Sequence, residues 1–181
     1  MSESLPVTEK QMGGLWDNHL KAEFTHKSPE EALSTMTGNP HVVIVPNMTG
    51  GKGTEELGTF YAKYFLNQLP ADMEILPLSR TIGRERVVDE LVLRFTHDIR
   101  MDWVLPGVPP TGKKIEFAMV VIVTMQGDKI VSENLYWDNA TILLQAGLLH
   151  DKKLPVVGAE SARYMLNPTE PLNQLIHRTQ R

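Results

Sequence analysis

The sequence predicts an α+β domain in which helices near the N-terminus cover one face of an antiparallel sheet. Two observations support this fold class. Apolar residues recur at helical spacing in the first third of the 181-residue chain. From residue 74 to residue 137 they alternate with polar residues at a period of two, as they do in half-buried strands.

The best-marked helix begins at Ser28. This residue can cap the helix, Pro29 suits its first position, and Glu31 completes a capping box before Gly38 ends the helix. The later glycine-rich stretch TGGKGTEEL lacks the spacing of a phosphate-binding loop, so a connector is expected there. Two further helices are expected at about residues 14–26 and 55–69, and a short strand at residues 41–46.

Four consecutive strands make up the expected sheet. The short sequences GRER and QGD separate them in pairs, as turns do in hairpins. Another helix is expected after Asp138, and the tail from Asp151 contains a possible short helix, AESARYMLN. The strands are expected at Glu74–Ile82, Val87–Asp98, Ile115–Met125 and Lys129–Trp137.

The alternation along each strand predicts which side chains face the core. Asp89 and His97 lie near the two ends of the apolar face of the second strand, and Glu133 shares a face with apolar neighbours on the last strand. A buried carboxylate must be ion-paired, hydrogen-bonded or protonated, and catalytic acids are often made in this way. Glu133 and Asp89 are therefore candidate catalytic residues. The alternatives for Glu133 are a bulge that turns it outward, or a purely structural ion pair.

Composition and charge exclude several classes of function. The net charge of −4 argues against a nucleic-acid partner, and the absence of cysteine removes disulfides, thiolate nucleophiles and cysteine metal sites. No run approaches the roughly 20 apolar residues of a membrane span. Because the N-terminus is polar and lacks the apolar stretch of a signal peptide, a cytoplasmic protein without a membrane partner is expected.

A second apolar face is expected on the sheet. Ala118, Val120 and Ile122 alternate with the core-facing residues of the third strand, where water would otherwise be expected. An apolar face turned away from the core often meets another subunit, so the sequence predicts a homodimer formed through this face.

The C-terminal half of the chain resembles the SnoaL-like polyketide cyclases. The resemblance is carried by Thr96-His97, Pro110-Thr111-Gly112-Lys113, Asp128-Lys129-Ile130-Val131, Asp138, and the helix end Leu143-Leu144-Gln145-Ala146-Gly147. It implies the cone-shaped, cystatin-like fold of nuclear transport factor 2, in which three helices pack on a curved antiparallel sheet and enclose a pocket. It thus suggests a cone domain at residues 1–150, followed by a helical tail, residues 151–181, that packs on the domain or on a partner subunit.

The resemblance also implies a mechanism, in which an aspartate in the cone acts as general acid/base without cofactor or metal. Asp138 matches that aspartate, although it is also well placed to cap the helix that follows it. His97 ends a core-facing strand and could shuttle protons, or it could be a structural histidine bonded to a backbone carbonyl.

Aromatic residues and the loop after the second strand are candidates for substrate binding. Asp102 and Trp103 are expected in a loop at the mouth of the cone, where Trp103 could cover an apolar ligand or plug the cone. Large side chains that filled the cone would instead indicate a dimerisation domain. The remaining candidates are Phe95, Phe117, Tyr136 and Trp137.

The first helix carries three residues that could bind a metal ion, but the sequence pattern favours an ordinary helix. His19, Glu23 and His26 lie at roughly helical spacing, and histidine with carboxylate can bind zinc. No H-E-x-x-H pattern occurs, so an ordinary amphipathic helix is the preferred interpretation and no metal is expected.

The function expected is a cofactor-independent enzyme acting on a small apolar carbonyl, enol or lactone-type compound by carboxylate acid/base catalysis. Cyclase, isomerase, dehydratase and hydrolase activities all fit this description. The alternative is a non-catalytic ligand-binding or dimerisation domain of the same fold, because a fold alone does not determine function.

Overall fold

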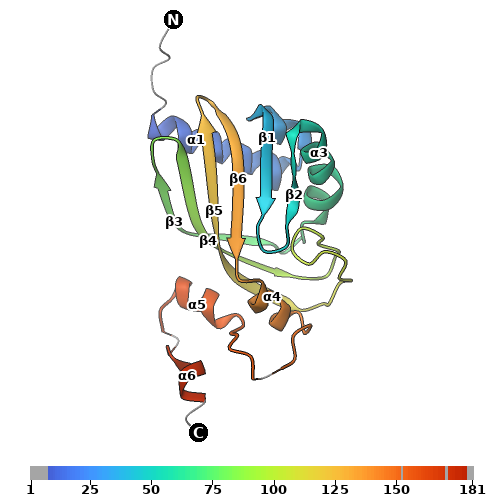
Figure 1. Ribbon diagram of the computed structural model, residues 1–181, viewed down its shortest axis with the longest axis vertical. Coiled ribbons are helices and arrows are strands. Elements are labelled where there is room, and N and C mark those ends of the chain that lie inside the picture. The colour runs from blue at the N-terminus through green and yellow to red at the C-terminus, as the bar shows by residue number, and fades with distance from the viewer. Residues whose placement is uncertain (1–7, 152, 170, 179–181) are drawn as a thin grey trace, which may run out of the picture.

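The computed structural model describes residues 8–151, 153–169 and 171–178 and confirms the α+β class. A curved, unclosed sheet of six strands in the order β2-β1-β6-β5-β4-β3 forms its centre (Figure 1). The strands are β1 (Met36–Ile44), β2 (Thr49–Lys52), β3 (Glu74–Ile82), β4 (Arg86–Thr96), β5 (Lys114–Gln126) and β6 (Lys129–Trp137).

Helices cover one face of the sheet. Figure 1 shows α1 (Glu9–Lys21) crossing that face, while α3 (Gly53–Phe60) lies beside the edge formed by β2. Between them, α2 (Pro29–Ser34) begins as expected, because the side chain of Ser28 accepts a hydrogen bond of 3.1 Å from the backbone N–H of Glu31.

Both long N-terminal helices end in a π-helical turn. The chain leaves α1 through Ala22–His26, and it leaves α3 through Tyr61–Phe65 and a short 3-10 turn, Leu66–Gln68. Such turns are frequently found at functional sites, because the extra residue re-aims the side chains that follow.

The glycine-rich stretch is a strand and not only a connector. Gly50 and Gly51 lie in β2, which pairs with β1. A Cβ atom on Gly50 would lie 2.0 Å from the carbonyl oxygen of Val42, and one on Gly51 would lie 2.8 Å from the backbone of Leu57. Glycine is therefore required for β1, β2 and α3 to approach one another so closely.

The sheet is mixed, which corrects the expectation of an antiparallel sheet. β1 runs parallel to β6, with Val42 opposite Glu133 and Ile44 opposite Leu135. The physical reason is the path of the chain, since the helical segment 53–68 carries it from the β2 edge of the sheet to β3 at the opposite edge. β1 is thereby left beside the last strand of the meander.

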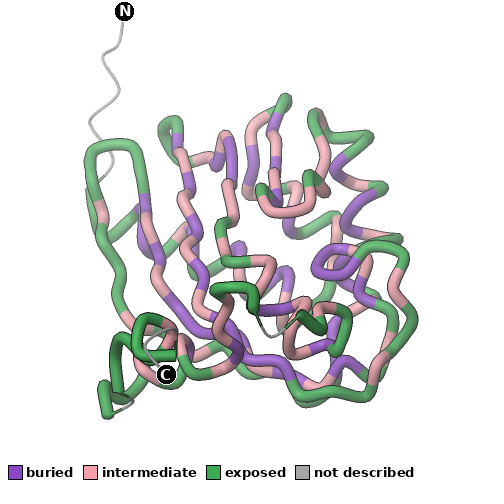
Figure 2. The backbone as a smooth tube through the Cα atoms, turned by 60° about the horizontal axis from the view of Figure 1, so that its bottom comes forward, coloured by how far each residue is buried: buried purple, intermediate pink, exposed green. Residues whose placement is uncertain are grey.

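The four-strand meander itself is confirmed. β3, β4, β5 and β6 pair antiparallel in sequence, close to the expected bounds. The face predicted for the core is buried on β4 and β5, from Val87 to Phe95 and from Ile115 to Met125 at alternate positions. Figure 2 shows this alternation as buried and partly buried segments along the inner strands.

The tail reaches the other face of the sheet. After α4 (Asn139–Gln145), the helix α5 (Glu160–Leu166) contacts β4 and β5, and Arg163 forms an ion pair of 2.9 Å with Glu116. A last short helix, α6 (Gln174–Arg178), follows. The division at residue 150 remains a prediction.

In the part of the chain that the structure describes, none of the helices combines the length and apolar character needed to span a bilayer.

Candidate functional site

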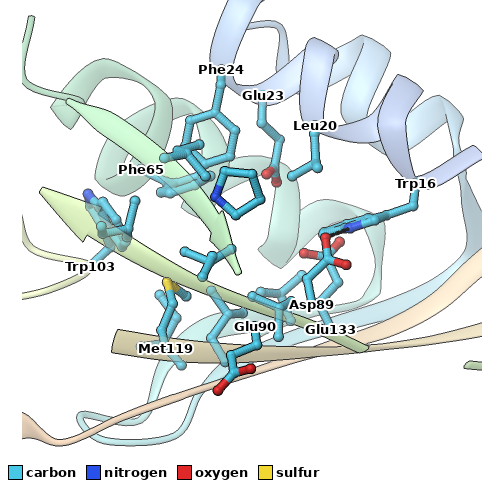
Figure 3. Close-up of a pocket in the computed structure, with 18 of the residues that line it drawn as sticks. Trp16, Leu20, Glu23, Phe24, Phe65, Asp89, Glu90, Trp103, Met119 and Glu133 are labelled. Atoms are coloured by element: carbon cyan, nitrogen blue, oxygen red, sulfur yellow. Dashed lines mark hydrogen bonds between the residues drawn. The ribbon is translucent and has the colours of Figure 1, made fainter. Parts of the chain in front are cut away.

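A cavity of about 540 Å³ lies between the helices and the concave face of the sheet, so the cone is hollow. Most of its wall is apolar, formed by Leu20, Phe24, Phe65, Leu91, Met119 and other residues of the same kind. Five charged side chains interrupt this wall, and three of them are buried carboxylates: the buried ones are Glu23, Asp89 and Glu133, and the others are Arg80 and Glu90. Glu23 comes from the π-helical turn Ala22–His26 that follows α1, and Glu133 comes from β6 (Figure 3).

Three buried ionisable side chains meet at this wall. Nε2 of His19 lies 3.1 Å from Oε1 of Glu23 and 2.9 Å from Oε1 of Glu133. The three residues are exposed by only 0%, 4% and 3%, respectively. We call them the His19 centre. The sequence interpretation of His19 and Glu23 as an ordinary helix face missed this centre, because Glu133 comes from a strand at the far end of the chain.

The two π-helical turns contribute to the centre. Glu23 lies in the turn that ends α1, and Tyr61 begins the turn that ends α3. The Tyr61 hydroxyl donates a hydrogen bond to Glu23 and lies 3.4 Å from Nε2 of His19. His26, the third residue of the expected helical set, instead pairs with Glu31 at the surface.

The other ring nitrogen of His19 is held by Thr35. Nδ1 lies 2.6 Å from the Thr35 hydroxyl, which itself donates to the carbonyl oxygen of Ala32. The hydroxyl has therefore used its hydrogen, and Nδ1–H of His19 must be the donor in this pair. Trp16 stacks on the imidazole at 5.5 Å and 15°, which fixes the plane of the ring.

Burial and mutual charge perturb the pKa values of His19, Glu23 and Tyr61. Burial alone would lower the pKa of His19, but the nearby charges of Glu133 and Glu23 raise it well above its ordinary value. Burial raises the pKa of Glu23, and the attraction of His19 only partly opposes this. Burial also raises the pKa of Tyr61, which therefore remains a hydrogen-bond donor. The centre thus retains protons beside an apolar cavity, where a proton-transfer group is useful.

Glu133 differs from Glu23 in its hydrogen bonding. The single hydrogen on Nε2 of His19 can point fully at only one carboxylate, and it is directed toward Glu23. Oε1 of Glu133 is buried and receives no directed hydrogen bond, although it lies closer to the ring. Glu133 is therefore the carboxylate that remains available to a group in the cavity.

Asp89 belongs to a second polar cluster. Its two oxygens accept hydrogen bonds of 2.6 and 2.7 Å from Arg80, and Oδ2 also accepts one of 2.7 Å from the Trp16 indole (Figure 3). Arg80 reaches Asp17 on α1 as well, at 2.7 Å. These contacts tie the edge strand β3 to α1 and connect Asp89, through Trp16, to the stacked ring of His19.

Two sequence-derived catalytic candidates lie away from the cavity wall. Asp138 accepts hydrogen bonds from the N–H of Ala140 and the hydroxyl of Thr141, so it caps α4. His97 is fully buried, and its Nδ1 contacts Thr111. Neither residue lines the cavity.

The loop after β4 closes one end of the cone. Trp103 is 1% exposed, lines the cavity, and packs edge-on against Phe65 at a ring distance of 5.0 Å. Asp102 lies behind it and accepts hydrogen bonds from Arg100, Gln68 and the backbone of Gly107, a set that lowers its pKa to about 2, with Arg100 as the main cause.

The remaining aromatic candidates do not line the cavity. Phe117 packs against Phe95 and Trp137 at ring distances of 6.2 and 5.3 Å, within the core. Tyr136 is exposed, on the opposite face of β6. Phe95, Phe117 and Trp137 therefore pack outside the cavity, and Tyr136 faces solvent.

The His19 centre is also a set of possible metal ligands. Among the described residues, its imidazole nitrogen and two carboxylate oxygens all lie within 4.8 Å of one another. Histidine and carboxylate together suit first-row transition metals.

Comparison with known proteins identifies one family over part of the chain. Residues 78–146 match the model of the SnoaL-like polyketide cyclase family. No curated protein matches the chain.

Solved structures share the fold at low sequence identity. A candidate SnoaL-like polyketide cyclase from Jannaschia sp. CCS1 is 18% identical, with a TM-score of 0.62 over 83% of this chain and 99% of the other. TsrD from Streptomyces laurentii is 12% identical, with a TM-score of 0.62 over 79% and 99%.

The epoxide hydrolase/cyclase-like enzyme SalBIII is 13% identical, with a TM-score of 0.54 over 74% of this chain and 95% of the other. A protein from Catenulispora acidiphila with a ketosteroid isomerase-like fold is 15% identical, with a TM-score of 0.56 over 75% and 93%. The family model thus matches residues 78–146, from β3 to α4, and the solved structures show that the chain shares the fold of SnoaL-like and ketosteroid isomerase-like proteins.

Proposed function

We propose that this protein is a cofactor-independent enzyme that binds a small apolar carbonyl, enol or lactone-type compound in its cone. Glu133 is the proposed general acid/base. The observation that carries the proposal is a pair of buried carboxylates, Glu133 and Glu23, on the wall of an apolar cavity, both directed at one imidazole nitrogen.

The cavity supports an apolar substrate of modest size. Its volume of about 540 Å³ falls within the range of roughly 300–1,000 Å³ typical of small-molecule sites. Apolar walls with a few convergent polar groups are also typical of such sites, because the polar groups orient the ligand while the walls exclude water.

The centre supports proton transfer by a simple division of roles. Glu133, whose Oε1 receives no directed hydrogen bond, takes or gives the proton at a substrate carbon or oxygen. His19 stabilises the carboxylate charge when Glu133 is ionised, and Glu23 and Tyr61 hold His19 in place. Asp89 is assigned a supporting role, because Arg80 and Trp16 already occupy its oxygens.

This chemistry covers isomerisation, cyclisation, dehydration and the opening of a lactone or epoxide. The similar structure SalBIII is described as having a role in pyran ring formation, which supports ring chemistry within this fold. His97 and Asp138 take no part in the proposed proton transfer, since neither lines the cavity.

Solvent deuterium exchange tests the proposal with a set of candidate compounds. A panel of cyclic ketones, enol ethers and lactones is incubated with the protein in D2O, and exchange or conversion is followed by NMR. Glu133→Gln should lower the rate for any responding compound by about 10²–10⁴-fold, as is typical when a general acid/base is lost. Glu31→Gln, which alters a surface carboxylate of the same type, should leave the rate unchanged.

The alternative of a non-catalytic binding domain has a distinct result. Compounds would then bind with measurable affinity and protect the cavity-lining Trp16 and Trp103 from fluorescence quenching, while no exchange or conversion occurred. Equal rates for wild type and Glu133→Gln would contradict the catalytic assignment.

We also propose that the protein is a cytoplasmic homodimer. Ala118, Val120 and Ile122 are half-buried on the face of the sheet opposite the cavity, which we call the outer face. α5 contacts β5 through Arg163 and Glu116 at one end of this strand. The apolar residues farther along β5 support pairing with a second copy.

A further inference from the structure

We infer that His19, Glu23 and Glu133 form a binding site for one divalent first-row transition-metal ion. Its ligands would be Nε2 of His19 and one oxygen of each carboxylate. This inference concerns the same centre as the proposed function and deepens it, because a bound cation would occupy Glu133 and block its proton transfer.

The distances from Nε2 of His19 to the two carboxylate oxygens match those between neighbouring ligands of an octahedron. Metal–ligand bonds of about 2.1 Å at right angles place neighbouring ligand atoms about 3.0 Å apart. Nε2 of His19 lies 3.1 Å from Glu23 and 2.9 Å from Glu133, and all three atoms lie within 4.8 Å of one another. A cation could therefore be accepted through small rotations of the two carboxylates.

The orientation of the imidazole matches that of a metal ligand. The hydroxyl of Thr35 accepts the hydrogen on Nδ1 and thus leaves Nε2 to face the two carboxylates. Metal-bound histidines almost always donate their second ring N–H in this way, because the bond fixes the tautomer and the ring orientation. The stacked indole of Trp16 restrains the ring further.

An independent observation comes from Glu133. This residue is 3% exposed, and its Oε1 atom lies 2.9 Å from Nε2 of His19, whose hydrogen is directed at Glu23 instead. This oxygen has only the imidazole of His19 beside it, which it shares with Glu23, and a cation at the centre would bind both carboxylates directly.

The charges of the neighbouring side chains point the same way. Two other buried acids of this protein pair with arginine: Asp89 with Arg80, and Glu116 with Arg94 and Arg163. Among the ion pairs recorded for the described residues, Glu23 and Glu133 have only His19 between them. Binding of the ion would displace the proton from Nε2 of His19 to solvent, and two carboxylates, a neutral imidazole and a dication then sum to zero charge, which a low-dielectric site favours.

The cavity supplies both an entry path and open coordination positions. Glu23 and Glu133 line it (Figure 3), whereas His19 is not among the residues of its wall. An ion held on this face would have its remaining positions directed at the cavity, where water or a substrate oxygen could bind. Mixed histidine and carboxylate ligands suit Mn²⁺, Fe²⁺ or Zn²⁺ better than Ca²⁺ or Mg²⁺.

Direct titration of the full chain tests the site. After treatment with a chelator and its removal, the protein is titrated with Mn²⁺ while the EPR signal of free Mn²⁺ is followed, and with Zn²⁺ by calorimetry. We expect one saturable site per chain. Glu133→Gln should weaken the affinity by at least about tenfold, because it removes a charged ligand and hardly changes the volume.

Glu31→Gln is the matched control. Glu31 pairs with His26 on the surface, so it offers the same ligand types outside the cavity. Its substitution should leave the affinity unchanged. Should Glu133→Gln fold poorly by circular dichroism, Mn²⁺ broadening of NMR signals in the wild type locates the ion instead. The indole N–H of Trp16 and the ring of His19 should broaden first.

Three results would overturn the inference: no saturable site for either ion, a site whose affinity survives Glu133→Gln, or broadening centred on His26. The test is separate from that of the catalytic proposal. Deuterium exchange without metal binding would contradict the metal site and support the proposed enzyme. Metal binding without exchange or conversion would support the metal site and contradict the proposed enzyme.

Discussion

Nε2 of His19 lies 2.9 Å from Oε1 of Glu133, and both side chains are almost completely removed from solvent. One residue comes from the first helix and the other from the last strand of the sheet. This contact joins the two ends of the domain at the wall of its cavity. It also makes each group dependent on the other, because a buried charge is tolerated only with a partner.

His19→Gln should therefore destabilise the protein strongly. The substitution leaves two buried carboxylates without a cation, and breaking a buried ion pair by removing one partner typically costs about 3–5 kcal/mol. Urea unfolding at neutral pH with chelator present measures the change. Glu133→Gln is the comparison, and it should cost less than about 1 kcal/mol, since Glu23 still partners His19. Similar losses in the two variants would show that the pairing is not as described.

Arg80→Gln should loosen the edge strand β3. Arg80 is the partner of Asp89, which is 7% exposed, and it also reaches Asp17 on α1. Its removal leaves a buried carboxylate with only the Trp16 indole as a donor. We expect a loss of about 2–4 kcal/mol in unfolding free energy and faster hydrogen exchange in β3. Unchanged exchange in β3 would mean that the ion pairs do not hold this strand.

Asp102 should make the unfolding free energy of the protein depend on pH in the acid range. Its folded pKa of about 2, lowered chiefly by Arg100, is below the unfolded value of about 3.9. The folded state therefore favours the ionised form, so the contribution is present above about pH 4 and is lost as the pH falls toward 2. The stability difference between wild type and Asp102→Asn, measured by urea unfolding, should shrink over that window. A difference that stayed constant from about pH 6 to about pH 2.5 would contradict this.

Gly50→Ala should disrupt the β1–β2 hairpin. Gly50 has a φ of 134°, and an added Cβ would lie 2.0 Å from the carbonyl oxygen of Val42, so the strands would have to separate. We expect a loss of at least about 2 kcal/mol, in the range of overpacking. Gly38→Ala is the control, because nothing lies within 4 Å of a Cβ there. Equal melting temperatures for the two variants would argue against close packing at Gly50.

If the outer face is a subunit interface, the protein should be a dimer in solution. Light scattering at micromolar concentration should give about twice the chain mass of 20.4 kDa. Val120→Glu places a charge on this face and should shift the protein toward the monomer, as a buried, unpaired charge opposes association. A wild-type monomer, or a dimer indifferent to this substitution, would exclude the outer face as the interface.

The elements of the meander and their inner face could be predicted from the amino-acid order. Strand periodicity is local, since successive side chains point to opposite sides whatever the strand pairs with. Local sequence also sufficed to predict that Ser28 caps a helix and that Glu133 is a carboxylate among apolar neighbours. The structure confirms both predictions. Asp138 as a cap likewise needed only the residues next to it.

Which strands are neighbours, and which acids meet, depends on how the whole chain packs. The parallel pairing of β1 with β6 follows from the path of residues 53–68, which cross from one edge of the sheet to the other. The glycines of β2 do not show a strand pattern in the sequence, because their pairing depends on the close approach of another backbone. The His19 centre depends on that topology, because parallel pairing sets Val42 opposite Glu133 beneath the end of α1. No local pattern marks a contact between residues so distant in sequence, since its stability comes from burial and charge in the assembled fold.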